Sequence, residues 1–228
     1  MLTLNNKEHI DPYLQDDGRP ANKDPTDCTT VYQSGNARAK RHQAYDIQGV
    51  GSLVCRHYFV LGIFHLWHGE RYGYILGLLV WFVAMATARG VDLNGAVIPF
   101  FYDVACRFKP YFDKHAPEDI KGLFDFVTGK VHGITHSAPC QLQNNCLYHA
   151  GSTDYSGEGC ETVWAAACKN APVAKYLTLL NYFRCWDRYF AYQNQLAVLR
   201  LASLLLTVGK RVHSTLKVCG GFLPPFYI

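Results

Sequence analysis

A run of 17 uncharged and mostly apolar residues, Tyr72 to Ala88, limits what this chain can fold into more than any other feature of the sequence. A helix needs about 20 apolar residues to cross a bilayer, and Arg71 and Arg89 prevent this run from being extended. A helix that is apolar on all sides is instead typical of the interior of an α/β domain. We therefore predict a buried helix and no membrane partner. The alternative, a small membrane-associated protein that spans at this run, is disfavoured by the mean hydropathy of -0.06.

Nine cysteines occur at irregular spacings among the 228 residues. A disulfide framework usually has an even number of cysteines and follows a secretory leader, which begins with basic residues and continues with an apolar stretch. The N-terminal sequence MLTLNNKEHIDPYLQDD contains no such leader. We therefore expect an intracellular, reducing compartment, in which the thiols are either small buried hydrophobes or metal ligands.

Three regions differ in composition along the chain. Residues 1–45 are polar and rich in turn residues, which predicts an irregular arm. Residues 46–172 combine β-branched apolar runs with helical patterns, as expected of an α/β domain. Residues 173–228 form a helical C-terminal extension in this interpretation, with one long helix or two consecutive helices between Lys175 and Lys217.

The middle region contains several predicted strands and helices. Two adjacent strands are expected between Tyr45 and Trp67, and another from Ala96 to Asp103. Pro99 cannot donate a ladder hydrogen bond, so that strand either pairs from Phe100 onward or lies at a sheet edge. The other predicted elements are a helix from Cys106 to Lys114, a strand from Gly129 to Ile134, a loop from Ser137 to Tyr155, and a helix with Ser156 as its N-cap that ends near Asn170.

Two acidic residues lie where a predicted strand ends and where a later helix begins. Asp103 ends the strand, and Glu161 shares one helix face with Trp164, Ala165 and Cys168, which predicts that it points inward. Paired carboxylates on rigid elements can hold the two Mg²⁺ ions that act on a phosphodiester. Alternatively, Glu161 is a surface residue of the helix that pairs with a lysine.

Cysteine and histidine residues form a second candidate site. Its members are Cys55, His57, His132, His136 and Cys140, whose short spacings suit a structural zinc ion. We expect at least three of them to lie close enough to share that ion, and Cys28 or Cys146 could complete the set. The alternative is a set of buried thiols and hydrogen-bonded core histidines.

Five motifs occur in a characteristic order between residues 46 and 190. They are Gly-Val-x4-Cys-Arg-His at 49–57, Gly-Glu-Arg-Tyr at 69–72, Tyr-Asp-Val-Ala-Cys at 102–106, His-x3-His-x3-Cys-Gln at 132–141, and Gly-Glu-Gly-Cys-Glu-Thr-Val-Trp at 157–164. In these motifs the chain resembles the KDZ (Kyakuja-Dileera-Zisupton) transposases, eukaryotic DNA transposases that are abundant in fungi. The resemblance implies a nuclear enzyme of transposable-element DNA recombination, with an RNase H-like DDE core of mixed sheet and flanking helices at residues 46–172. It also implies Asp103 as the second catalytic acid and Glu161 as the third, with Glu158 as a nearby substitute.

The chain departs from the family pattern in two places. The first catalytic aspartate of the family lies in an Asp-Gly-Asn-Phe strand before the polar arm, and the sequence beginning Met1-Leu2-Thr3-Leu4 contains no such motif. Thr162 and Ala165 stand where the family usually has arginine and serine. We therefore expect a fragment that lacks its first catalytic strand, a truncated gene model in which Met1 is not the true start, or a decayed copy. Its function is either strand cleavage and transfer or, as an inactive or domesticated relative, binding of DNA or a protein.

Positive charge is concentrated at the C-terminal end. After Glu161 the chain has eight basic residues and one acidic residue, a net charge of +7. Seven of these eight are candidates for phosphate contacts, namely Lys175, Arg184, Arg188, Arg200, Lys210, Arg211 and Lys217, and a second basic group is Arg38, Lys40 and Arg41. Together with the family resemblance they predict contacts to the phosphates of double-stranded DNA. The alternative is that they only solubilise amphipathic helices. A homo-oligomer is a further expectation.

Overall fold

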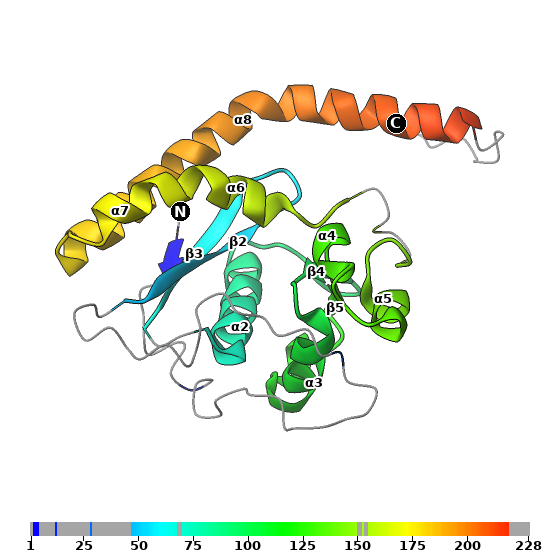
Figure 1. The fold of residues 1–228 in the computed structure, drawn as a ribbon, viewed down its shortest axis with the longest axis horizontal. Coiled ribbons are helices and arrows are strands. Elements are labelled where there is room, and N and C mark those ends of the chain that lie inside the picture. The colour runs from blue at the N-terminus through cyan, green and yellow to red at the C-terminus, as the bar shows by residue number, and fades with distance from the viewer. Residues whose placement is uncertain are drawn as a thin grey trace.

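The computed structural model describes residues 2–4, 12, 28, 47–67, 70–149, 152 and 155–218. These residues form a mixed α/β structure in which helices predominate and the strands belong to two small sheets (Figure 1). The predicted α/β class is therefore confirmed. The RNase H-like arrangement stays a prediction, because the described strands do not join into one sheet.

The larger sheet has three strands. Strands β2 (Gly49–Val54) and β3 (Val60–Leu66) are the two adjacent strands that the sequence predicted, and they pair in antiparallel orientation. Strand β1 (Leu2–Leu4) pairs with β3 in parallel, so β3 is central. This first strand lies within the stretch that was expected to be an irregular arm.

Both faces of β3 are covered, which explains its nearly continuous apolar sequence. Phe64 and Leu66 pack into one cluster with α2 (Tyr72–Ala88), whereas Val60 and Ile63 pack into a second cluster with C-terminal helices. Figure 1 shows α2 on one side of this sheet and the C-terminal helices on the other. The sheet therefore separates two apolar cores.

Helix α2 has the bounds that the uncharged run predicted. Its first half, from Gly73 to Leu79, is buried, and its second half is partly exposed. Gly62 of β3 is needed for this packing, because a Cβ there would lie 2.5 Å from the Trp81 ring. No helix within the described ranges is long and apolar enough to cross a bilayer.

The smaller sheet consists of β4 (Ile98–Phe101) and β5 (Phe124–Val127), which are parallel. Between them lie α3 (Ala105–His115), which confirms the predicted helix, and the 3-10 turn η2 (Glu118–Ile120). Pro99 lies within β4 opposite Asp125. Each strand of a two-stranded sheet is an edge strand, so the edge position that was one of the two expectations for Pro99 is confirmed.

Two predictions between β5 and residue 155 are wrong. Residues 129–134 do not form a strand; they contain the short helix α4 (Lys130–Gly133), and the apolar side chains of Val131 and Ile134 are 60% and 68% exposed. The expected loop from Ser137 contains helix α5 (Ala138–Asn144), whose first turn accommodates a proline because its N–H would be unbonded there anyway.

The C-terminal third is helical. Helix α6 (Gly159–Ala167) is followed by the 3-10 turn η3 (Cys168–Asn170), helix α7 (Ala171–Ala174) and helix α8 (Leu179–Val218). The expected N-cap at Ser156 is wrong, since Glu158 occupies the N-cap position and makes no capping side-chain hydrogen bond. The long helical region predicted after Lys175 is one helix of 40 residues.

Helix α8 is anchored on the three-stranded sheet near its N-terminal half. Trp186 and Phe190 are buried against Val60 and Ile63. The Asn194 side chain accepts from the Val60 N–H at 2.8 Å and donates to the Val60 carbonyl at 2.9 Å. Figure 1 shows the C-terminal half of α8 continuing beyond the rest of the described structure.

Candidate functional site

Three carboxylates converge on the imidazole ring of His132. Its Nδ1 lies 3.5 Å from an oxygen of Asp103 and 3.3 Å from an oxygen of Glu158, and its Nε2 lies 3.1 Å from an oxygen of Glu161. One imidazole thus contacts residues that are up to 58 positions apart in the sequence (161 − 103). Asp103 and Glu161, the two acids singled out in the sequence, therefore both contact this ring.

The folding of the smaller sheet explains why these side chains meet. Strands β4 and β5 are parallel, so their C-terminal ends lie at the same edge. Asp103 follows the end of β4, and α4, which carries His132, follows the end of β5. The start of α6 then brings Glu158 and Glu161 to this edge.

A tight backbone contact places the start of α6. Gly157 has a φ of +83°, and a Cβ at this position would lie 2.8 Å from the Cα of Gly129. The Val131 N–H donates to a Glu158 carboxylate oxygen at 3.1 Å. Glycine at position 157 therefore permits both the left-handed turn and the close approach that sets Glu158 against α4.

Exposure of the two glutamates differs from the sequence-based expectation. The Glu161 side chain is 56% exposed, whereas that of Glu158 is 17% exposed. Of the helix face predicted to point inward, Trp164 packs against Trp186 and Phe190, while Ala165 and Cys168 are exposed. The prediction that Glu161 points inward is wrong, and Glu158 is the more enclosed of the two.

Burial and repulsion between carboxylates raise the pKa of two of the acids, Asp103 and Glu161. Burial raises the pKa of Asp103; the nearby Glu161 raises it further, and His132 opposes both effects. Burial and the adjacent Glu158 also raise the pKa of Glu161, again against the effect of His132. A cation at this position, either a protonated imidazole or a metal ion, would stabilise the charged carboxylates.

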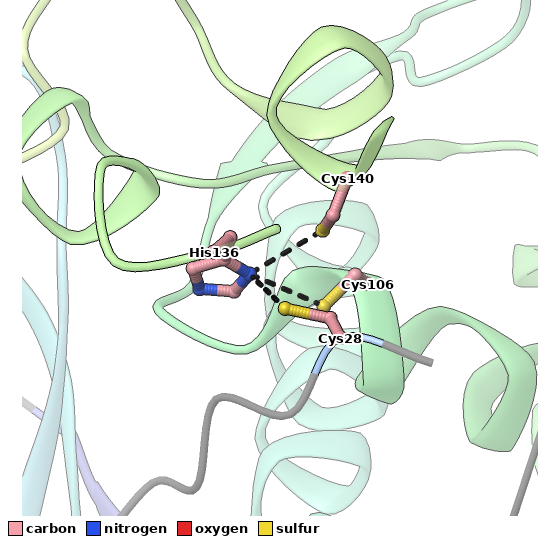
Figure 2. A group of neighbouring side chains, drawn as sticks. All are labelled: Cys28, Cys106, His136 and Cys140. Carbon is pink, nitrogen blue, oxygen red and sulfur yellow. Dashed lines mark hydrogen bonds between the residues drawn. The ribbon is translucent and has the colours of Figure 1, made fainter. Parts of the chain in front are cut away.

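A second group joins one histidine to three cysteines, as Figure 2 shows. The Nδ1 atom of His136 lies 3.1 Å from the sulfur of Cys28, 3.6 Å from that of Cys106 and 3.3 Å from that of Cys140. The four possible ligand atoms all lie within 4.8 Å of one another. A buried group of this composition can hold a metal ion such as zinc.

These four residues come from separate parts of the fold. Cys106 lies in the first turn of α3, Cys140 lies in α5, and His136 lies just before α5. Cys28 and His136 are 108 positions apart, and the Arg107 guanidinium holds the Cys28 backbone by donating to its carbonyl oxygen.

Burial keeps the sulfur group neutral when no cation is present. It raises the pKa of the Cys106 and Cys140 thiols, and the neighbouring sulfur atoms raise that of Cys106 further. Burial lowers the pKa of His136, which favours the neutral imidazole that metals require as a ligand.

The predicted cysteine and histidine set is only partly correct. His136 and Cys140 lie in the sulfur group, but His132 faces the carboxylates, and Cys55 and His57 lie in the β2–β3 connection outside both groups. Of the two proposed additions, Cys28 joins the group and Cys146 does not. Cys106 was missed, although its position in the motif Tyr-Asp-Val-Ala-Cys, three residues after Asp103, is a signal that could have identified it.

Comparison with known proteins gives one match. The profile of the family KDZ, Kyakuja-Dileera-Zisupton transposase, matches residues 3–194. No curated protein and no solved structure matches the chain. The matched range contains all members of both the carboxylate group and the sulfur group.

Proposed function

Because this chain belongs to the Kyakuja-Dileera-Zisupton transposase family, we propose that it acts in DNA strand cleavage and transfer, with Asp103, Glu158 and Glu161 in its catalytic centre. Asp103 and Glu161 take the roles of the second and third catalytic acids. Glu158, which is better enclosed, provides a further oxygen ligand or replaces Glu161. The observation that supports this most is the convergence of the three carboxylates on His132.

The donor atoms suit Mg²⁺. This ion prefers hard oxygen ligands and usually takes one or two carboxylates together with water and substrate phosphates. When bound, it would polarise a scissile phosphodiester and lower the pKa of an attacking hydroxyl group. The two-metal DDE mechanism also uses an aspartate from an Asp-Gly-Asn-Phe strand, and the sequence does not contain this motif.

His132 contributes to this site through its position between the acids. Its two ring nitrogens face carboxylates on opposite sides, so it orients Asp103 and Glu158 through one nitrogen and Glu161 through the other. In the protonated form it also neutralises part of their charge. His132 thereby keeps the acids close together when no divalent ion is bound.

The proposed nucleic-acid partner is double-stranded DNA, which α8 contacts through basic side chains. The helix contains six basic residues and one acidic residue, and Arg184, Arg188, Arg200 and Lys210 are exposed. Lys175 is also exposed before the helix, whereas the side chain of Lys217 and the group Arg38, Lys40 and Arg41 lie outside the described residues. A nuclear location and a homo-oligomer remain predictions.

A second candidate function is DNA binding without catalysis. It is favoured by the charge of α8. When a protein binds DNA through phosphate contacts, the logarithm of the binding constant falls linearly with the logarithm of the salt concentration, with a slope of about -0.9 per contact. Arg184→Gln combined with Arg188→Gln should therefore reduce the magnitude of that slope by about 2 on a fluorescent duplex, while Lys109→Gln on α3 should leave it unchanged.

Nicking of supercoiled plasmid DNA by the full chain in Mg²⁺ tests the catalytic proposal. We expect nicked circles that form only with the divalent ion, at a rate that Asp103→Asn or Glu161→Gln lowers by about 100-fold or more. Asp113→Asn is the matched control, because Asp113 is a surface residue whose described partner is Lys109 at 2.6 Å.

The outcomes separate the two functions. If the wild-type chain does not nick DNA, or if all three variants nick at the wild-type rate, the catalytic proposal is wrong. If the wild-type chain does not nick DNA but binds a duplex in a salt-dependent way, its function is DNA binding without catalysis.

A further inference from the structure

We propose that Cys28, Cys106, His136 and Cys140 bind one structural zinc ion that joins three separate parts of the chain. This site is independent of the proposed strand cleavage. It would connect Cys28 to the start of α3 and to the segment that contains His136 and α5, residues that lie up to 108 positions apart in the sequence.

Hydrogen bonding does not account for the arrangement in Figure 2. All three sulfur atoms approach the same ring nitrogen, Nδ1 of His136, at 3.1, 3.3 and 3.6 Å. That nitrogen carries either one hydrogen or one lone pair, so it can form one good hydrogen bond. A cation between the four atoms explains why all three sulfurs gather there.

The distances match those of a tetrahedral zinc site. Zinc bonds are about 2.3 Å long to sulfur and about 2.0 to 2.1 Å to nitrogen, and a tetrahedral angle then separates sulfur from nitrogen by about 3.6 Å. The Cys106 sulfur lies at this separation from Nδ1, at 3.6 Å, and the sulfurs of Cys140 and Cys28 lie somewhat closer, at 3.3 and 3.1 Å. All four ligand atoms lie within 4.8 Å of one another, which is also compatible with four ligands around one ion.

The ligand types select zinc among the common cellular metals. Three thiolates and one imidazole form the Cys₃His set of structural zinc sites, whereas Mg²⁺ and Ca²⁺ require oxygen ligands. Cys28 is 4% exposed, His136 is 5% exposed and Cys140 is 7% exposed, whereas Cys106 is partly exposed. Four protein ligands would fill the tetrahedron and leave no coordination position for a substrate or an exchangeable water. A closed site with four protein ligands is typical of a structural ion.

Zinc content of the full chain, purified under reducing conditions without chelator, tests the proposal. Elemental analysis should find about one zinc ion per chain in the wild type. Cys106→Ser and Cys140→Ser should each lower this content by about tenfold or more, because each removes a ligand. Cys146→Ser is the matched control, since Cys146 is fully buried at 0% exposure but lies outside the group.

Cobalt substitution provides a second measurement that needs no variant. Co²⁺ bound to the wild-type chain should give the intense sulfur-to-cobalt charge-transfer absorption and the visible bands of tetrahedral coordination, and added zinc should abolish both. A wild-type chain that contains no zinc and gives no such spectrum would overturn the proposal. So would zinc content that is equal in the wild type and in all three variants.

Neither measurement involves DNA or Mg²⁺. The zinc site can therefore fail while strand cleavage is observed, and it can be confirmed in a chain that does not cleave DNA.

Discussion

His132 and His136 are four positions apart, yet their imidazole rings belong to two chemically different groups. His132 lies among three carboxylates, and His136 lies among three sulfur atoms. The same relation holds for Asp103 and Cys106, which are three positions apart at the start of α3. The two groups thus share two short backbone segments, so a constraint on the sulfur group also restrains the carboxylates.

Removal of zinc is expected to loosen both groups. A ligand that binds only the folded state stabilises that state by about 2.7 kcal/mol when the free ligand concentration is 100 times the dissociation constant. A chelator should therefore lower the melting temperature and speed amide hydrogen exchange in residues 103–106 and 132–140. Exchange in α2 provides the internal reference. Equal protection of these segments with and without chelator would contradict the expected coupling.

Gly157→Ala is expected to destabilise the fold and displace Glu158. The substitution costs about 1 to 2 kcal/mol for a side chain at positive φ, and the added Cβ also meets the Gly129 backbone and the Phe101 ring. Gly95→Ala is the matched control, because Gly95 also has a positive φ of +69° but open space around its Cα. Urea unfolding should show a larger loss for Gly157→Ala. Equal losses would mean that the contact with Gly129 does not matter.

Acid is expected to weaken the fold through His65. This ring lies in β3 against Phe183 and Tyr182 of α8, and its two nitrogens are buried without a hydrogen-bond partner among the described residues. Burial lowers its pKa to about 4. Since unfolded histidine takes up a proton near pH 6.5, the unfolded state binds more protons between pH 6.5 and 4, and stability falls as the pH falls through this range. The loss reaches about 3 kcal/mol.

His65→Phe tests this interpretation. The free energy of unfolding in urea should fall less for the variant than for the wild type between pH 7 and pH 4.5. The reason is that the phenylalanine side chain cannot be protonated in the folded or the unfolded state. His213→Phe, at an exposed position of α8, controls for the removal of a histidine as such. Parallel pH profiles for the wild type and His65→Phe would assign the pH dependence to other groups.

Asn194→Ala is expected to release α8 from the three-stranded sheet. It removes two hydrogen bonds and leaves the Val60 N–H and carbonyl groups without this partner, at a cost of about 1 to 3 kcal/mol. The neighbouring Gln195 is exposed, so Gln195→Ala should change stability by less than about 0.5 kcal/mol. Limited proteolysis should then cut Asn194→Ala faster than the control. Equal rates would show that the buried rings of Trp186 and Phe190 suffice to hold α8.

Elements with strong local patterns could be predicted from the sequence, whereas sites built from distant residues could not. The uncharged run located α2, and the short apolar run with Pro99 located the edge strand β4. The strand predicted at residues 129–134 is wrong, because this segment contains the short helix α4 and its apolar residues Val131 and Ile134 are exposed.

The same limit applies to the candidate sites. The spacing of His136 and Cys140 was visible in the sequence, but Cys28 is 108 positions from His136, and nothing local indicates that they meet. His132 has the same spacing to His136 as His136 has to Cys140, and only the position of α6 directs it to the carboxylates instead. Tertiary structure, not spacing, divides these histidines between the two groups.

Binding of Mn²⁺ in place of Mg²⁺ tests the carboxylate site most directly. It is measured as the loss of the electron paramagnetic resonance signal of free Mn²⁺. The zinc-loaded full chain should bind Mn²⁺, and Asp103→Asn and Glu161→Gln should each weaken this binding by about tenfold or more, because each neutralises one carboxylate beside His132. Asp113→Asn should bind as the wild type does. A wild-type chain that does not bind Mn²⁺ at millimolar concentration, or equal affinity in all four proteins, would contradict the assignment of Asp103, Glu158 and Glu161 as a divalent-ion site.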